Sequence, residues 1–205
     1  MSDETAIVTG ASGGIGAAIA KAMLERGYRV VSLALDKPDW SHPRLEAREV
    51  DLFDAKATVA VAAAVAGEHD VTHIVHNAGV IRPNAVEAAT AADITALAQL
   101  HLGAPLILLN ASLAKMKQRR FGRIVLISSR AALGATGRTA YSATKAGIIG
   151  MGRTWALELA PFGITVNMVA PGPIQGTQMF HEIVPAGSDR ETALAAGSMS
   201  TWRTS

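Results

Sequence analysis

The stretch Thr9-Gly10-Ala11-Ser12-Gly13-Gly14-Ile15-Gly16 decides the fold of this chain. It follows a short apolar run over 6–8 and opens an Ala-rich segment with helical periodicity over 14–26. Glycine lets the backbone turn sharply between a strand and a helix and lets it approach a phosphate closely. Such a turn alone also occurs as an ordinary tight connection, but its place between the first strand and the first helix favours a nucleotide site. No Gly-Lys-Ser/Thr follows, which argues against the P-loop of nucleoside triphosphatases.

The alternation of strand and helix patterns continues as far as residue 169. The pattern predicts strands at 6–8, 29–35, 45–50, 71–76, 123–127 and 164–169, and helices at 14–26, 54–66, 90–117 and 141–159. A kink is expected in the third helix near Gly103-Ala104-Pro105, and Asp54 is a suitable N-cap for the second helix. This order predicts an α/β fold, a doubly wound parallel (Rossmann) sheet of about six strands in three α/β/α layers. We expect one domain over 1–205.

Composition narrows the class of protein. The chain has 205 residues, of which 49% are hydrophobic and 18% charged, as expected for one globular domain. There is no cysteine, so disulfides, thiolate catalysis and cysteine-ligated zinc are excluded, and no metal is expected. We expect a cytoplasmic protein without a signal peptide, because the first residues are polar and acidic. No apolar run looks long enough to span a bilayer, so no membrane partner is expected.

Net charge is +2, and basic residues concentrate only near the end of the third predicted helix. A solvated helix end explains this cluster better than a nucleic-acid site, so no nucleic-acid partner is expected. The members of the cluster are Lys115, Lys117, Arg119, Arg120 and Arg123.

Ligands of such sheets bind beyond the carboxyl ends of the strands. Asp36 lies twenty residues beyond Gly16, near the end of the second predicted strand. A carboxylate there would accept hydrogen bonds from both ribose hydroxyls and repel a 2′-phosphate. Lys37 beside it would attract that phosphate, or it is simply a solvated charge. The cofactor is therefore NAD or NADP, with NAD favoured.

A tyrosine and a lysine four residues apart, Tyr141 and Lys145, share one face of a predicted helix. A nearby ammonium stabilises phenolate and lowers the pKa of the tyrosine, which favours proton transfer to a carbonyl oxygen. Ser129 follows the fifth predicted strand, where its hydroxyl would hold the same oxygen. Ser128 is the alternative.

These residues resemble the motifs of the short-chain dehydrogenase/reductase family over about residues 6–179. The glycine spacing Gly10, Gly14, Gly16 is similar to its TGxxxGxG turn, and Tyr141 to Lys145 to its YxxxK pair. The segments Asn77-Ala78-Gly79 and Pro171-Gly172 resemble its NAG and PG motifs. The resemblance implies the following NAD(P)-binding residues: Gly10, Ser12, Gly14, Ile15, Gly16, Asp36, Asp51, Leu52, Asn77, Ala78, Gly79, Tyr141, Lys145, Pro171, Gly172, Ile174 and Thr177.

The resemblance also implies a reaction and its catalytic residues. Hydride would pass between the nicotinamide and a carbonyl or secondary alcohol carbon of a small molecule. Tyr141 would be the general acid/base, Lys145 would lower its pKa and bind the nicotinamide ribose, and Ser129 would polarise the substrate. A 3-oxoacyl-thioester reductase or an alcohol/ketone dehydrogenase is expected, assembled as a homo-oligomer (dimer or tetramer).

Three departures from the family pattern leave alternatives open. His101 stands where the family usually has an asparagine, and it is either a proton-relay member or a buried histidine. His76 before the NAG segment is interpreted as a strand-end histidine with its hydrogen bonds satisfied. No final family strand can be written after Phe180, and 190–205 form an atypical tail that is expected to be disordered. We therefore expect weak activity or a covered sheet edge, and the alternative is a non-catalytic nucleotide-binding protein, such as a redox sensor or an assembly subunit.

Overall fold

A computed structural model describes residues 4–174, with Thr177, Phe180, Val184, 187–189 and Thr192 beyond them. The chain divides into two units, Met1–Gly172 and Pro173–Ser205. The strands and helices named below lie in the first unit. The single domain over 1–205 stays a prediction, and the expected tail, apart from Thr192, lies outside the described residues.

Six parallel strands form one sheet in the first unit. In sheet order they are β3 (Leu45–Glu49), β2 (Arg29–Ala34), β1 (Thr5–Thr9), β4 (Val71–His76), β5 (Gly122–Ile127) and β6 (Ile164–Val169). All five residues of β1 are buried, because this strand is central and covered on both faces. The doubly wound parallel sheet is confirmed. Any strand after residue 174 would lie outside the continuous described part, so the missing family strand stays a prediction.

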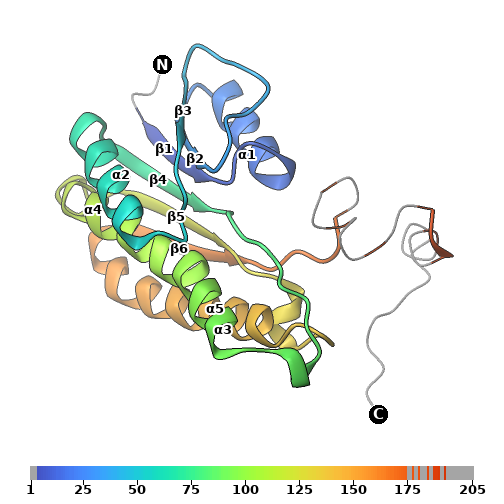
Figure 1. The fold of residues 1–205 in the computed structure, drawn as a ribbon. Helices are drawn as coiled ribbons and strands as arrows, with labels where there is room; N and C mark the ends of the chain where they lie inside the picture. Colours follow the sequence, from blue (N-terminus) through green and yellow to red (C-terminus); the bar gives the residue numbers. More distant parts are fainter. Residues whose placement is uncertain are drawn as a thin grey trace. The chain divides into compact units, whose positions relative to one another are not determined.

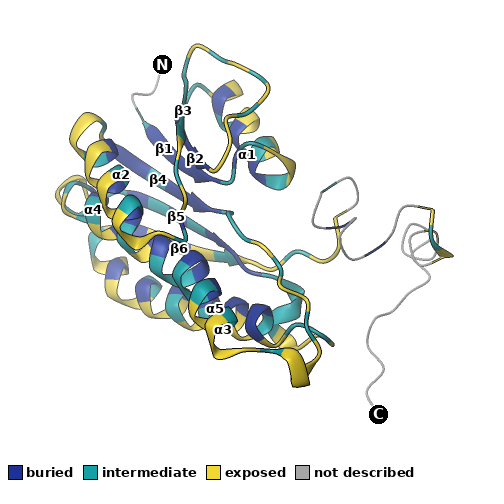
Figure 2. Cartoon of the chain, viewed as in Figure 1, coloured by how far each residue is buried: buried dark blue, intermediate teal, exposed yellow. Residues whose placement is uncertain are grey.

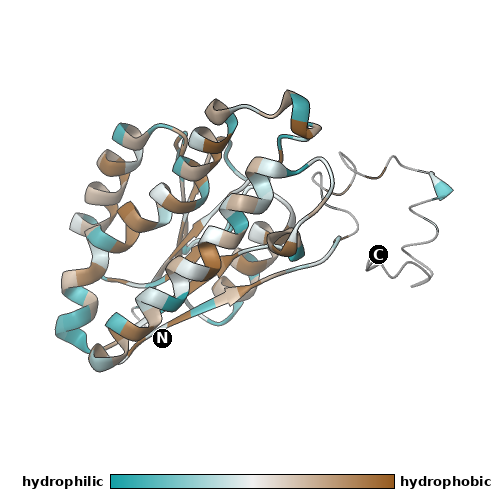
Figure 3. Ribbon diagram, turned by 90° about the horizontal axis from the view of Figure 1, so that it is seen from below, coloured by the Kyte–Doolittle hydropathy of each residue, from teal (hydrophilic) through white to brown (hydrophobic). Residues whose placement is uncertain are grey.

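The helices lie on both faces of the sheet (Figure 1). Helix α1 (Gly14–Glu25) connects β1 to β2 on one face, and α2 (Ala55–Glu68), α4 (Ala104–Arg119) and α5 (Thr139–Leu159) lie along the other. Right-handed crossovers require this division, because the chain winds outward from β1 in both directions. The strands between these layers are mostly buried (Figure 2), and the helices carry both hydrophobic and hydrophilic residues along their length (Figure 3).

Local sequence explains the main boundaries. The Asp54 carboxylate accepts hydrogen bonds from the amides of Lys56, at 2.7 Å, and Ala57, at 3.1 Å, so the predicted N-cap of α2 is confirmed. Helix α3 (Ala91–Ala98) begins with a capping box between Thr90 and Asp93. Three short 3-10 turns complete the connections: η1 (Val86–Ala88), η3 (Arg130–Leu133) and η4 (Ala160–Phe162).

The kink expected near Pro105 is a single π turn, η2 (Gln99–Gly103), between α3 and α4. The amide of Ala104 donates to the Gln99 carbonyl, five residues back, and Pro105 has no amide hydrogen to donate. A π turn in a long helix often lies at a functional site.

The continuous helix Ala91–Arg119 is long and apolar enough to cross a membrane by length and composition. The expectation that no segment reaches that length is therefore wrong. Leu108, Leu109 and Met116 of this helix are buried in the main hydrophobic core. Its apolar character is thus accounted for by packing against the sheet.

Candidate active site

The site lies where the strand order reverses. β1 is bonded to β2 on one side and to β4 on the other, and Thr9 and His76 are partners at their carboxyl ends. The chains leaving β1 and β4 diverge to opposite faces, and in open α/β sheets a ligand binds at such a switch point. The glycine turn and the Asn77-Ala78-Gly79 segment both begin there.

The glycine turn has the close approaches that a dinucleotide loop requires. A Cβ on Gly16 would lie 2.1 Å from the Gly10 carbonyl oxygen, so no larger residue fits without moving backbone. Gly10 has a φ of +66°, and its carbonyl accepts from Asn77 Nδ2 at 3.3 Å. Helix α1 starts at Gly14, which leaves its first amides free for a pyrophosphate. Ser12 and Ile15 are half-buried in this turn.

The residues predicted to bind the adenosine half follow β2 and β3. Asp36 is exposed beyond the end of β2. Lys37 pairs with Glu49 at 3.4 Å, so its charge is directed to β3. Asp51 accepts from the amide of Phe53 at 2.9 Å, and Leu52 is buried.

The predicted proton-transfer residues come together at the same edge of the sheet. Tyr141 and Lys145 lie in the first turns of α5 and are both buried. Lys145 Nζ donates to the Ile127 carbonyl at 2.8 Å and lies 5.6 Å from the centre of the Tyr141 ring. Ser129, just after β5, forms a hydrogen bond with Tyr141 that lowers the pKa of the phenol.

The two candidate serines have different partners. Ser128 Oγ is buried and donates to the Lys145 carbonyl at 2.7 Å, so it fastens β5 to α5. Ser129 Oγ accepts from the amide of Ala131 at 3.1 Å and contacts the phenol. This difference favours Ser129 as the substrate-facing serine.

Electrostatics at Tyr141 differ from the sequence-based expectation. Burial raises the pKa of Tyr141, while the Ser129 hydrogen bond and the charge of Arg138 act in the opposite direction. Arg138 lies one helical turn before Tyr141 and was not among the predicted residues. Burial lowers the pKa of Lys145 to about 8. The pKa of Tyr141 is therefore raised overall, and the contributions that lower it come from Ser129 and Arg138, not from Lys145 as expected.

His101 lies in the π turn and is fully buried beside α5. Its Nδ1 is 2.8 Å from Thr144 Oγ1, and that hydroxyl donates to the carbonyls of Ala140 and Tyr141. If the single hydroxyl hydrogen is used in this way, Nδ1 of His101 must donate to the hydroxyl, which would leave Nε2 with a free lone pair. A Cβ placed on Gly79 would lie 3.0 Å from this Nε2 and 3.3 Å from Lys145 Nζ.

The remaining predicted cofactor residues follow β6. The Pro171 carbonyl accepts from the amide of Arg130 at 3.0 Å, which places Pro171-Gly172 beside the Ser129 turn. Ile174 and Thr177 belong to the second unit, where the Thr177 hydroxyl donates to the Ile174 carbonyl at 2.8 Å. Their contact with a nicotinamide stays a prediction.

Two further polar clusters lie outside this site. Glu46, Glu68 and His69 have ligand atoms within 4.8 Å of one another, the only such group among the described residues. The guanidinium of Arg48 is bonded to both glutamates, and His69 Nε2 lies 2.9 Å from Glu46, so the atoms that would bind a metal ion already have partners and one of the two negative charges is balanced.

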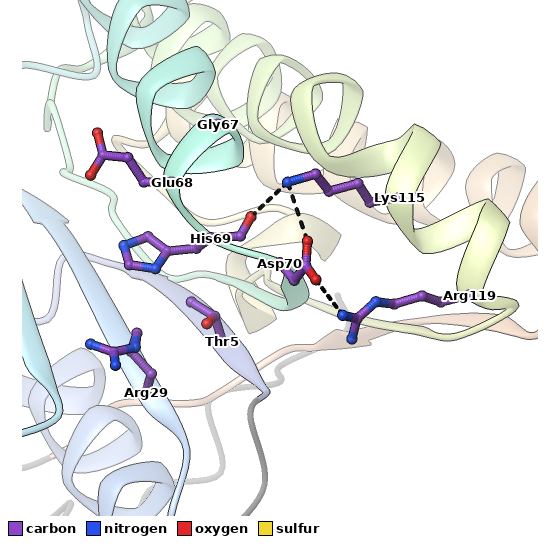
Figure 4. A pocket seen from close by; sticks show the side chains of 8 residues that line it. All are labelled: Thr5, Arg29, Gly67, Glu68, His69, Asp70, Lys115 and Arg119. Atoms are coloured by element: carbon purple, nitrogen blue, oxygen red, sulfur yellow. Dashed lines mark hydrogen bonds and ion pairs between the residues drawn. The ribbon is translucent and has the colours of Figure 1, made fainter.

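A pocket of about 630 Å³ opens at the opposite, amino-terminal edge of the sheet (Figure 4). Lys115 and Arg119 on its wall both pair with Asp70. Other members of the basic cluster also have internal partners, since Arg120 donates to the Pro161 carbonyl and Arg123 to the Gly163 carbonyl. The basic cluster at the end of α4 thus bonds to the start of β4 and to the segment before β6.

Comparison with known proteins agrees with this geometry. Residues 4–187 match the family model described as short chain dehydrogenase. The chain belongs to the short-chain dehydrogenase family. Acetoacetyl-CoA reductase of Synechocystis is 37% identical over 175 residues, which cover 84% of this chain and 72% of the relative. The 3-oxoacyl-[acyl-carrier-protein] reductase of Vibrio cholerae is 33% identical over 183 residues, covering 85% and 75%.

A solved structure extends the comparison to the cofactor. It is a putative NAD(P)-dependent gluconate 5-dehydrogenase from Beutenbergia cavernae with bound NADP at low occupancy. It superposes with a TM-score of 0.83 at 28% identity, and the match covers 95% of this chain and 80% of that one. Together with the family and the glycine turn, it supports NAD(P) as the cofactor of an oxidoreductase.

Proposed function

We propose that this short-chain dehydrogenase interconverts a 3-oxoacyl thioester and the corresponding 3-hydroxyacyl thioester with NAD(H). The observation that carries the proposal is the buried Tyr141, which is bonded to Ser129 and lies one turn before Lys145 at the cofactor edge. Two relatives whose names specify acetoacetyl-CoA or a 3-oxoacyl carrier protein support this substrate class.

In the reductive direction, Tyr141 donates the phenolic proton to the substrate carbonyl oxygen. The bound reduced nicotinamide supplies the hydride for the carbonyl carbon, so the product is a secondary alcohol. Ser129 holds the same oxygen and keeps the phenol oriented. In the oxidative direction, Tyr141 takes the proton back, and the Ser129 bond and the Arg138 charge both favour the phenolate that does so.

Lys145 contributes a fixed cation. Its ammonium donates to the Ile127 carbonyl, and its backbone carbonyl accepts from the Ser128 hydroxyl. Such anchoring holds the ammonium ready for the ribose of the nicotinamide. His101 serves the site as a neutral acceptor, because burial and the Lys145 charge lower the pKa of its imidazole to about 2. A relay through a protonated His101 would not fit that value.

We also infer a preference for NAD over NADP. Asp36 is exposed beyond β2, where a carboxylate would repel a 2′-phosphate. Lys37, which could attract that phosphate, is paired with Glu49. Tighter binding of NADH than NADPH in parallel fluorescence titrations is expected, and Asp36→Ser should reduce the difference between the two dissociation constants.

The central test is Tyr141→Phe, with Tyr28→Phe as the matched control at the amino edge of the sheet. We expect the turnover of acetoacetyl-CoA with NADH to fall by about 100-fold or more in Tyr141→Phe and to stay unchanged in Tyr28→Phe. The dissociation constant of NADH should be unchanged in both variants. Wild-type protein that binds NADH but reduces neither acetoacetyl-CoA nor simple ketones would instead favour a non-catalytic nucleotide-binding protein.

A further inference from the structure

His76 is the last residue of β4, is fully buried, and has no assigned part in the proposed reaction. Its Nδ1 lies 3.0 Å from Thr9 Oγ1, at the start of the glycine turn. The same hydroxyl accepts from the amides of Asn77, at 3.0 Å, and Ala78, at 2.9 Å. The Thr9 hydroxyl thus joins the glycine turn to the Asn77-Ala78 segment, and His76 is bonded to that hydroxyl.

The hydrogen-bond count at Thr9 fixes the tautomer of His76. A hydroxyl has two lone pairs and one hydrogen. The two amides occupy both lone pairs, so the hydroxyl hydrogen is donated to Nδ1 of His76. The imidazole therefore carries its hydrogen on Nε2. The reverse tautomer would direct three donors at one oxygen in a fully buried position, with the hydroxyl hydrogen left unbonded.

The other side of the ring faces the π turn. The Leu100 carbonyl interacts favourably with the imidazole and raises its pKa, although Nε2 does not reach hydrogen-bond geometry with any described atom. Pro105 lacks the amide hydrogen that would otherwise reach back to the carbonyls of this turn. His76 therefore lies between the cofactor loop and the turn that carries His101.

We propose that His76, held in its Nε2–H tautomer, is a positioning residue for the dinucleotide: it orients the Thr9 hydroxyl that joins the glycine turn to the Asn77-Ala78 segment. The proposal rests on the cofactor class of the proposed function but not on its substrate. Without the acceptor at Nδ1, the Thr9 hydroxyl loses its fixed orientation, and the two cofactor-binding segments lose their common anchor.

His76 is not itself suited to acid–base chemistry. Burial and the Lys145 charge lower the pKa of its imidazole to about 3, whereas Leu100 acts weakly in the other direction. The charged or titratable neighbours that influence it or His101 are Lys145 from α5 and the two histidines themselves. Its ring therefore stays neutral at working pH, and its effect is one of geometry.

The first experiment measures dissociation constants of NADH and NADPH by fluorescence titration. His76→Phe keeps an aromatic ring but removes both nitrogens, and we expect it to weaken binding of the preferred dinucleotide about 10-fold. His76→Asn places an amide oxygen near the former Nδ1 and should stay within about threefold of wild type. Thr9→Val should weaken dinucleotide binding at least as much as His76→Phe, because it also removes the acceptor of the Asn77 and Ala78 amides. The double variant should bind no more weakly than Thr9→Val alone.

Thr72→Val is the matched control for a lost buried hydroxyl in the same sheet. Thr72 is buried at the amino end of β4, and its hydroxyl donates to the Thr5 carbonyl at 3.3 Å. This variant should bind dinucleotide like wild type even if it unfolds at a lower temperature. Equal affinity of wild type and His76→Phe, or equal weakening by Thr72→Val, would overturn the proposal.

The second experiment needs neither cofactor nor variant. Nitrogen NMR of the cofactor-free protein at pH 7 should show both buried histidines neutral and in opposite tautomers, Nε2–H for His76 and Nδ1–H for His101. An Nδ1–H tautomer for His76 would overturn the proposal even if the protein reduces ketones. Conversely, a protein without turnover whose His76→Phe variant loses NADH affinity would refute the proposed reaction and leave this inference standing.

Discussion

Folding buries the ammonium of Lys145, and the free-energy cost of burying this charge depends on pH. Burial lowers its pKa in the folded state from 10.5 to about 8. Between these pH values the unfolded chain holds a proton on Lys145 that the folded chain has released. The free energy of unfolding therefore increases as pH rises through this range and decreases as pH falls.

We predict that this contribution is worth about 3 kcal/mol between pH 8 and 10.5. Urea unfolding of wild type and Lys145→Met across this range should show wild type gaining that amount relative to the variant as pH rises. A constant difference between the two proteins would contradict the lowered pKa.

Thr144 is the second residue for which we predict an effect on stability, because its buried hydroxyl is bonded to His101 Nδ1 at 2.8 Å. We predict that Thr144→Val lowers the free energy of unfolding by about 1–3 kcal/mol, since it leaves a buried N–H without its partner. Thr154→Val is the matched control: Thr154 is exposed on the same helix, and its hydroxyl also donates to the carbonyl four residues back. Chemical denaturation should show a loss below about 0.5 kcal/mol for the control, and equal losses would mean that the buried hydrogen bond between Thr144 and His101 does not stabilise the fold.

At the scale of an element, the glycine turn contains one glycine that no larger residue can replace, Gly16, and one that alanine can replace, Gly13. A Cβ on Gly16 meets the Gly10 carbonyl, whereas a Cβ on Gly13 has no atom within 4 Å. We predict that Gly16→Ala weakens NADH binding more than 10-fold, because the turn must move away from the helix. Gly13→Ala should bind within about twofold of wild type. Fluorescence titration compares the two, and equal effects would mean that the turn tolerates side chains.

The π turn η2 contacts three other parts of the fold. Gln99 Nε2 donates to the Leu52 carbonyl at 3.3 Å, and Gly103 leaves room for that side chain. The same turn places His101 against Thr144 and the carbonyl of Leu100 against the ring of His76. It therefore connects the loop after β3 with α5 and β4.

At the scale of the whole molecule, the two buried histidines should make the fold sensitive to acid. Their folded-state pKa values are about 3 and about 2, below the usual 6.5. Below pH 6.5 the unfolded chain binds protons that the folded chain does not, so stability falls as pH falls. We predict a loss of about 3 kcal/mol per pH unit below pH 6, which pH-dependent urea unfolding would measure. His76→Gln should halve the slope, and stability that is constant from pH 7 to 5 would contradict the prediction.

Assembly stays a prediction as well. Among the described strands, β6 is bonded to β5 alone, so one of its edges is open to further contacts. We expect a dimer or tetramer by light scattering of the full chain, and a monomer at all concentrations would contradict this.

The sequence predicted the fold because the relevant signals are local. Each strand–turn–helix unit, the Asp54 cap and the kink near Pro105 depend on neighbouring residues, and right-handed crossovers place the helices on both faces of the sheet. The order of the strands within the sheet was not predicted and comes from the structure. Tyr141, Lys145 and Ser129 were predicted as catalytic residues in the same way, through their places after a strand and at a helix start, and their roles stay a prediction. The third helix was predicted at 90–117 with a kink and is continuous over Ala91–Arg119, so only the expectation that no segment is long and apolar enough to cross a membrane was wrong.

Other features were decided by tertiary structure alone. Thr9 was missed as a member of the site because its partners, His76, Asn77 and Ala78, are distant in the sequence. Arg138 was missed although it lies only one helical turn before Tyr141, because a single basic residue at a helix start is an ordinary feature of a sequence. The sequence by itself determined a Rossmann sheet with a Tyr141/Lys145 pair at its carboxyl edge. Only the fold decided that burial raises the pKa of the Tyr141 phenol, and that Nδ1 of His76 faces the Thr9 hydroxyl while Nδ1 of His101 faces that of Thr144. A tautomer depends on which hydroxyl faces which nitrogen in the core, and no local pattern records that.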